Sequence, residues 1–232
     1  MVQKRWRPQL TREEQIKGFI FFALYFLVFP FLKMGVEVFF DHFFGLFLSE
    51  AMSAAVYYYI MGVLTMTVFW SFLKNAGRIF LDFLPENLLA ILTGFVAERL
   101  LTLLFNRLPW PLENPTAASW AEQYAYSYGA TIIITVLLMP VIEEVLFRGL
   151  VFGSLRKRSR VLAWIISMLL FMVYNVWTFA VAYGDARYLI LSLQYIPMAL
   201  ALTWCYDRGG SIWSCALLHA VFDAMILFQA VN

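Results

Sequence analysis

Long apolar runs separated by short polar segments extend over most of the chain. A helix needs about 20 mostly apolar residues to cross a bilayer. By that measure we expect seven membrane spans, at approximately 18–36, 52–73, 86–106, 128–147, 161–183, 187–206 and 211–230. A shorter apolar stretch, 38–49, carries Asp41, His42 and Glu50, and we interpret it as an interfacial helix. The pattern predicts an all-α fold, a polytopic transmembrane bundle of about seven to eight helices.

Composition supports a membrane protein. Apolar residues make up 62% of the chain and charged residues only 14%, whereas a soluble domain is roughly half apolar. The net charge of +2 is too small to indicate binding to nucleic acid. Cys205 and Cys215 both lie in apolar segments, so no disulfide framework is indicated. We expect membrane lipids around the bundle and no nucleic-acid partner.

The positions of the basic residues predict how the chain is oriented. Cytoplasmic loops carry an excess of Lys and Arg. Basic residues precede the first predicted span and follow the second and fourth: Lys4, Arg5, Arg7, Lys74, Arg78, Arg156, Lys157, Arg158 and Arg160. This pattern predicts a multi-pass protein of the cell membrane with a cytoplasmic N-terminus and a C-terminus outside. The first apolar run lacks a small-residue cleavage pattern and is therefore interpreted as a retained signal anchor.

Three charged side chains lie together at the end of an apolar run. They are Glu143, Glu144 and Arg148, and charges at bilayer depth usually face the protein interior and pair. Glu144 and Arg148 are four residues apart, which places them on one helix face as an ion pair. Glu143 is then left with less compensation and is a candidate general base. The alternative is that all three only brace the cytoplasmic end of a helix.

Three later polar residues interrupt apolar segments. Asn175 lies in the fifth predicted span, and His219 and Asp223 lie four residues apart in the last one, on one helix face. Asn175 alone is typical of interhelical hydrogen bonding, and the His–Asp pair is equally a structural contact or half of a metal site. Together with Glu143 and Glu144 these residues indicate a polar cavity. A base, a water and hydrogen-bond donors in such a cavity suit peptide hydrolysis.

The motifs resemble those of the CPBP family, the CAAX proteases and bacteriocin-processing enzymes also called Abi. Glu143, Glu144 and Arg148 match its Glu-Glu-x-x-x-Arg motif, and His219 with Asp223 matches its His-x-x-x-Asn/Asp motif. The segment from Phe171 to Asn175 occupies the place of its Phe-x-x-x-His motif. The resemblance covers roughly 125–230. It divides the chain into N-terminal transmembrane helices, 1–124, and a CPBP/Abi-type protease core, 125–232, with four core helices.

The resemblance implies an intramembrane endopeptidase like the Ras-converting CAAX endopeptidases, which remove the last three residues of prenylated proteins. A glutamate-activated water would act in a polar cavity that opens to the cytoplasm. By the same resemblance, Glu143 activates the water, Glu144 pairs with Arg148, and His219 with Asp223 holds the oxyanion or the site geometry. The implied partner is a peptide or protein substrate, lipidated in the CAAX precedent.

Asn175 departs from the family pattern, because the family has a histidine at this position. An amide cannot take up a proton at neutral pH and is a poor zinc ligand. We therefore expect no cofactor, and zinc is the alternative that the missing histidine disfavours. Two other functions stay open: a catalytically impaired pseudo-protease that binds a membrane-protein partner as a scaffold, and a transporter with a proton relay. Inverted repeats typical of transporters are not visible.

Overall fold

The computed structural model describes residues 9–47 and 49–232, and every regular element in that part of the chain is helical. The basic residues Lys4, Arg5 and Arg7 lie outside the described residues. The N-terminal half forms α1 (Arg12–Leu27), α2 (Phe29–Phe44), α3 (Glu50–Val68), α4 (Trp70–Asp82) and α5 (Leu84–Phe105). The all-α bundle predicted from the apolar pattern is confirmed.

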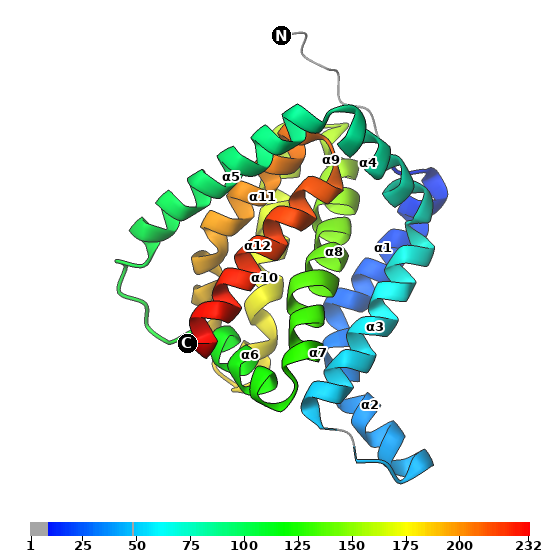
Figure 1. Cartoon of the computed structure of the whole chain (residues 1–232), viewed down its shortest axis with the longest axis vertical. Helices are drawn as coiled ribbons and strands as arrows, with labels where there is room; N and C mark the ends of the chain where they lie inside the picture. The colour runs from blue at the N-terminus through cyan, green and yellow to red at the C-terminus, as the bar shows by residue number, and fades with distance from the viewer. Residues whose placement is uncertain (1–8, 48) are drawn as a thin grey trace.

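The C-terminal half begins with α6 (Pro115–Tyr126), which lies across one end of the bundle (Figure 1). A continuous rod follows, made of α7 (Tyr128–Ile132), the π-helical η1 (Ile133–Leu138), α8 (Met139–Glu144), the π-helical η2 (Val145–Phe152) and α9 (Gly153–Arg156). The chain then forms α10 (Arg160–Ala182), the 3₁₀ segment η3 (Ala186–Tyr195), α11 (Ile196–Gly209) and α12 (Ile212–Val231).

Five helical stretches of the described chain are long and apolar enough to cross a membrane, or six if the bent pair of α3 and α4 is one span. The axes of α3 and α4 differ by 81°. The first predicted span, 18–36, is instead divided at Val28, because Pro30 lies in the first turn of a new helix. Each of α1 and α2 has 16 residues, about 24 Å, which is short of the roughly 30 Å core. Of the predicted interfacial helix, 38–49, residues 38–44 form the second half of α2, residues 45–47 and 49 are not helical, and residue 48 lies outside the described residues.

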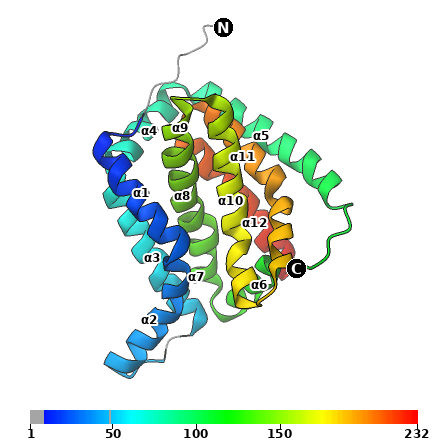
Figure 2. The ribbon, with the colours of Figure 1, turned by 180° about the vertical axis from the view of Figure 1, so that it is seen from behind.

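The rod from α7 to α9 stands between the N-terminal helices α1 and α3 and the C-terminal helices α10 and α12 (Figures 1 and 2). On the far side of α11 and α12, α5 runs obliquely across the bundle. Gly94 permits this close approach: a Cβ at this position would lie 2.8 Å from Leu218 Cδ2 and 3.3 Å from the carbonyl oxygen of Ala201. The rod is thereby enclosed on several sides, which places its polar residues inside protein.

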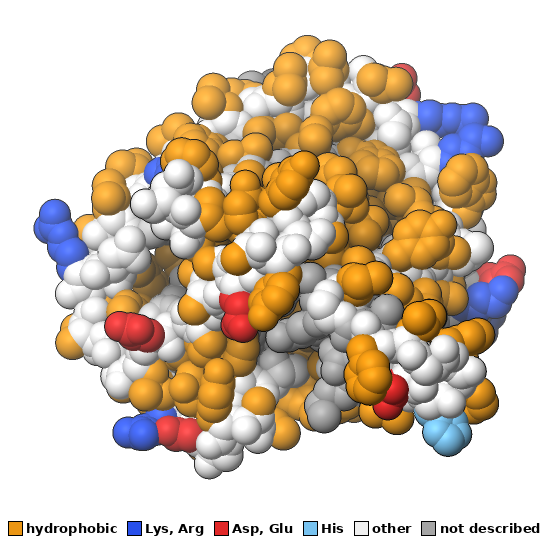
Figure 3. All heavy atoms as spheres, turned by 60° about the horizontal axis from the view of Figure 1, so that its bottom comes forward, with side chains coloured by type: hydrophobic (Ala, Val, Ile, Leu, Met, Phe, Trp, Pro, Cys, Tyr) orange, Lys and Arg blue, Asp and Glu red, His pale blue; other side chains and the backbone are white. Residues whose placement is uncertain are grey.

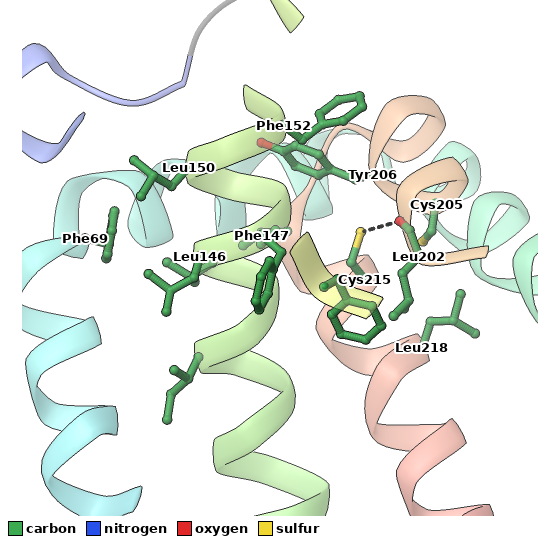
Figure 4. Packing of buried hydrophobic residues seen from close by; sticks show 14 of the residues in the cluster. Phe69, Leu146, Phe147, Leu150, Phe152, Leu202, Cys205, Tyr206, Cys215 and Leu218 are labelled. Carbon is green, nitrogen blue, oxygen red and sulfur yellow. Dashed lines mark hydrogen bonds between the residues drawn. The ribbon is translucent and has the colours of Figure 1, made fainter. Parts of the chain in front are cut away.

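A dense apolar layer fills the end of the bundle near α9. Phe147, Leu150, Phe152 and Tyr206 are fully buried, and the rings of Phe152 and Tyr206 pack edge to face (Figure 4). Cys215 lies in the same layer, with its Sγ 3.6 Å from the carbonyl oxygen of Leu202. Both cysteines are free and buried, which agrees with the packing role that their apolar surroundings predicted.

Candidate functional site

A buried ion pair joins α8 to η2. The Arg148 guanidinium donates from Nη1 to Oε1 of Glu144 at 2.8 Å, and both side chains are 0% exposed. The same carboxylate oxygen lies 2.9 Å from Nδ1 of His219 on α12. The predicted pairing of Glu144 with Arg148 is therefore present. Glu144 also links the rod to α12, a contact that its sequence spacing did not indicate.

The imidazole of His219 lies between two carboxylates. Opposite the Glu144 contact, its Nε2 is 3.5 Å from Oδ2 of Asp223. The ring packs edge to face against Phe171, at a centroid distance of 5.6 Å, and the Arg148 guanidinium lies 4.1 Å from the centre of the same ring. Phe171 thus packs against both the imidazole of His219 and the guanidinium of Arg148. The sequence placed Phe171 in a motif but did not predict its contacts with His219 and Arg148.

Glu143 lies beside this network and faces a cavity of about 730 Å³. Its side chain is 2% exposed, and its Oε2 has no hydrogen-bond partner among the described residues. Asn175, His219 and Asp223 line the same cavity. Four of the six predicted site residues thus share one space, while Glu144 and Arg148 lie behind it and hold His219.

Asn175 is half-buried on α10, and its side-chain amide makes a hydrogen bond within its own helix. Its Nδ2 donates to the carbonyl oxygen of Phe171, four residues earlier, at 2.8 Å. Such a bond fixes the rotamer of the side chain at the cavity wall. One further N–H and the carboxamide oxygen are then the groups that Asn175 can offer to a molecule in the cavity.

A second polar cluster, on α5, lines the cavity and was missed in the sequence. Glu98 is 4% exposed and accepts hydrogen bonds from Arg99, with Nη2 at 2.6 Å from Oε1, and from Thr102 Oγ1 at 2.8 Å. Farther along the wall, Asn114 donates to Gln194 and Tyr195. The available signal was the pair of adjacent charges inside the predicted span 86–106.

The residues present do not fit a zinc ion. Among the described residues, no group of three or more His, Cys, Asp and Glu side chains has an arrangement that could hold a metal. Both ring nitrogens of His219 face carboxylates, and the amide of Asn175 is a poor zinc ligand. We therefore derive no chemical step through a metal.

Each of the comparisons with known proteins covers less than half of the chain. Residues 126–225 match the family described as type II CAAX prenyl endopeptidase Rce1-like. "Putative membrane peptidase YdiL" of Bacillus subtilis (strain 168) is 25% identical over 102 residues, which are 44% of this chain and 37% of that protein. "UPF0177 protein YxdF" of Lactococcus lactis subsp. lactis (strain IL1403) is 29% identical over 84 residues, 36% of this chain and 41% of that protein. No solved structure matches the chain significantly.

Proposed function

Since the chain belongs, through residues 126–225, to the CPBP family of Rce1-like CAAX endopeptidases, we propose that it is an intramembrane endopeptidase whose general base is Glu143. The family match and the transmembrane helices support a membrane peptidase of the CAAX protease type. The mechanism, the substrate and the residue roles are our proposal. The observation that carries it is the buried, unpartnered carboxylate oxygen of Glu143 at a cavity shared with His219, Asp223 and Asn175.

In the proposed reaction, Glu143 takes a proton from a water molecule while the water oxygen attacks the scissile carbonyl carbon. The resulting tetrahedral oxyanion accepts a hydrogen bond from His219 Nε2–H. Without substrate this nitrogen faces Oδ2 of Asp223 at 3.5 Å, a distance longer than that of an ordinary hydrogen bond. The carbon–nitrogen bond then breaks, and Glu143 returns the proton to the leaving amine. The products are a carboxylic acid and an amine, which exchange a proton to give a carboxylate and an ammonium group, so atoms and charge balance without a cofactor.

The remaining residues position this machinery. Glu144 holds His219 through Nδ1, and Arg148 compensates the charge of Glu144. Because Nδ1 is held by Glu144, the Nε2 edge of the ring is directed to the side of the cavity and Asp223. Asn175 is placed on the same wall, where its free amide groups can orient the water or the substrate carbonyl.

The test is Glu143→Gln, which keeps the shape of the side chain and removes the base. New protein N-termini are to be quantified in membranes of cells that express the wild-type chain, Glu143→Gln or no protein. We expect termini that depend on the wild-type chain to fall at least about 100-fold in the variant, the range typical of a lost general base. Glu113→Gln is the matched control, because Glu113 is exposed outside the cavity.

A set of termini that is equal in wild type and Glu143→Gln, with both proteins folded and equally abundant, would contradict the proposal.

One observation favours a second function, a pseudo-protease that binds a partner protein: Asn175 stands where the family resemblance places a histidine. A scaffold should keep its partner after Glu143→Gln, as measured by crosslinking in intact membranes, and should generate no termini in either form.

A further inference from the structure

Basic residues gather at one end of the bundle. This end is formed by α4, α9, the following loop and the last turn of α11 (Figure 1). The basic residues on these segments are Lys74, Arg78, Arg156, Lys157, Arg158, Arg160 and Arg208. The opposite end has fewer, among them Arg107 and Arg187, and Arg187 is paired with Asp185 at 2.7 Å. The positive-inside rule counts Lys and Arg near span ends, so the end with α4 and α9 is assigned to the cytoplasm.

The apolar layer at that end separates the site from the cytoplasmic loops. Leu146, Phe147, Leu150 and Phe152 are 0% exposed on η2, and Tyr206 is 0% exposed on α11 (Figure 4). In an interior packed this closely, few voids larger than a water molecule occur. A peptide approaching from the basic end would therefore have to displace the packed core of the bundle before it reached Glu143.

The cavity extends toward the other end instead. Its wall runs from Glu143 on the rod to the last turns of α5 and α12, the loop after α5, and α6, all at the end distant from α4 and α9 (Figure 1). Asn106 and Gln229 are exposed on this wall, whereas Glu143 is buried. Figure 3 views this end and shows mainly apolar side chains with few charges. At this end the cavity is lined by Thr102, Asn106, Trp110, Asn114, Trp120 and Gln229.

We infer that the cavity is entered from the non-cytoplasmic side of the membrane and takes a peptide segment exposed on that side. This inference rests on the proposed peptidase function for the substrate and on geometry alone for the entrance. It differs from the cytoplasmic opening that the family resemblance implied. Trp110 and Trp120 near the entrance are the residue type that sits at headgroup level. They place the entrance at the outer interface, where a segment flanking a membrane anchor can enter.

The entrance is tested by cysteine labelling, which does not depend on catalysis. Gln229→Cys and Asn106→Cys place a thiol on the exposed wall, and Lys157→Cys places one in the loop after α9. Cells that carry each variant are treated with a membrane-impermeant maleimide, with or without permeabilisation. The native Cys205 and Cys215 are buried, so the unmodified chain gives the background.

We expect Gln229→Cys and Asn106→Cys to be labelled in intact cells and Lys157→Cys only after permeabilisation. The reverse pattern would overturn the assignment of the entrance. Labelling of all three positions, or of none, in intact cells would overturn it as well, because the two ends would then not lie on opposite sides of the membrane.

The substrate is tested by the side of the membrane on which the cleaved segments lie. We expect the N-termini that depend on Glu143 to map to segments on the non-cytoplasmic side of membrane proteins, and cleavage within cytoplasmic segments would overturn the inference. If no terminus depends on Glu143, the proposed peptidase function and the substrate assignment both fail. The labelling pattern in that case still decides on which side the cavity opens.

Discussion

Arg148 is a cation with 0% exposure deep in the bundle, bound to Glu144 and packed against the face of Phe171. Removing one partner of a buried pair leaves the other charge uncompensated, which typically costs about 3–5 kcal/mol. We therefore predict that Arg148→Ala lowers the free energy of unfolding by about that amount and lowers the melting temperature in lipid nanodiscs. Arg158→Ala, at an exposed position, is the control and should change little.

Arg148→Lys separates charge from geometry. A lysine keeps a positive charge near Glu144 but loses the planar guanidinium on the Phe171 ring, so its melting temperature should lie between those of wild type and Arg148→Ala. If Arg148→Ala melts like the wild type, the ion pair does not stabilise this bundle.

Asn175 offers a prediction about activity. In the family pattern an imidazole stands at this position, and an imidazole can take up and release a proton at near-neutral pH, which an amide cannot. We predict that Asn175→His raises the turnover of the Glu143-dependent cleavage, measured with a substrate identified by the terminus survey. The variant Asn175→Leu removes all hydrogen-bonding groups and should lower it. Equal turnover in all three forms would show that this position takes no part in the reaction.

The sequence predicted the site residues that lie close together along one helix. Glu144 and Arg148, like His219 and Asp223, are four residues apart, and helical geometry alone brings each pair together. The bond between Glu144 and His219 joins residues 75 positions apart. No local pattern specifies such a contact, because it depends on how α12 packs on the rod. Glu98 and Arg99 are adjacent in the sequence, but no local pattern shows that α5 lines the cavity.

At the scale of elements, the close contact of α5 with α11 and α12 depends on Gly94. A methyl group at this position would meet Leu218 at 2.8 Å and the backbone of Ala201. Overpacking of this kind typically costs about 1–3 kcal/mol, so we predict that Gly94→Ala lowers the melting temperature. Gly129→Ala is the control, since nothing lies within 4 Å of a Cβ there, and it should be neutral. An unchanged melting temperature for Gly94→Ala would mean that α5 can move outward freely.

Element boundaries were predicted less well than element existence. The span predicted at 128–147 ended just before the charged residue Arg148, yet the helical rod continues to Arg156. Its continuation is possible because Glu144 compensates the charge of Arg148 inside the protein. The split of the first span at Val28 had a visible cause in Pro30, whose ring removes a backbone donor. The apolar pattern around it concealed the break.

At the scale of the whole molecule, the cavity wall combines the two parts into which the sequence was divided. Glu143, His219 and Asp223 come from the segment that matches the family. Glu98 and Arg99 come from α5 and Asn106 directly follows it, all outside residues 126–225. The division at residue 124 therefore separates the family core from part of its own cavity. The site needs both parts, so the isolated segment 125–232 is expected to lose the α5 wall.

The course of the last helices gives a prediction about topology. The rod ends at the basic end in α9, α10 returns to the opposite end, η3 and α11 lead back to Arg208, and α12 crosses once more (Figures 1 and 2). Alkaline phosphatase, which folds only outside the cytoplasm, should therefore be active when fused after residue 232 and inactive when fused after Lys157. A green fluorescent protein at the same two positions should give the opposite pattern. An active phosphatase after Lys157 would place the basic loops outside and reverse the orientation of the whole bundle.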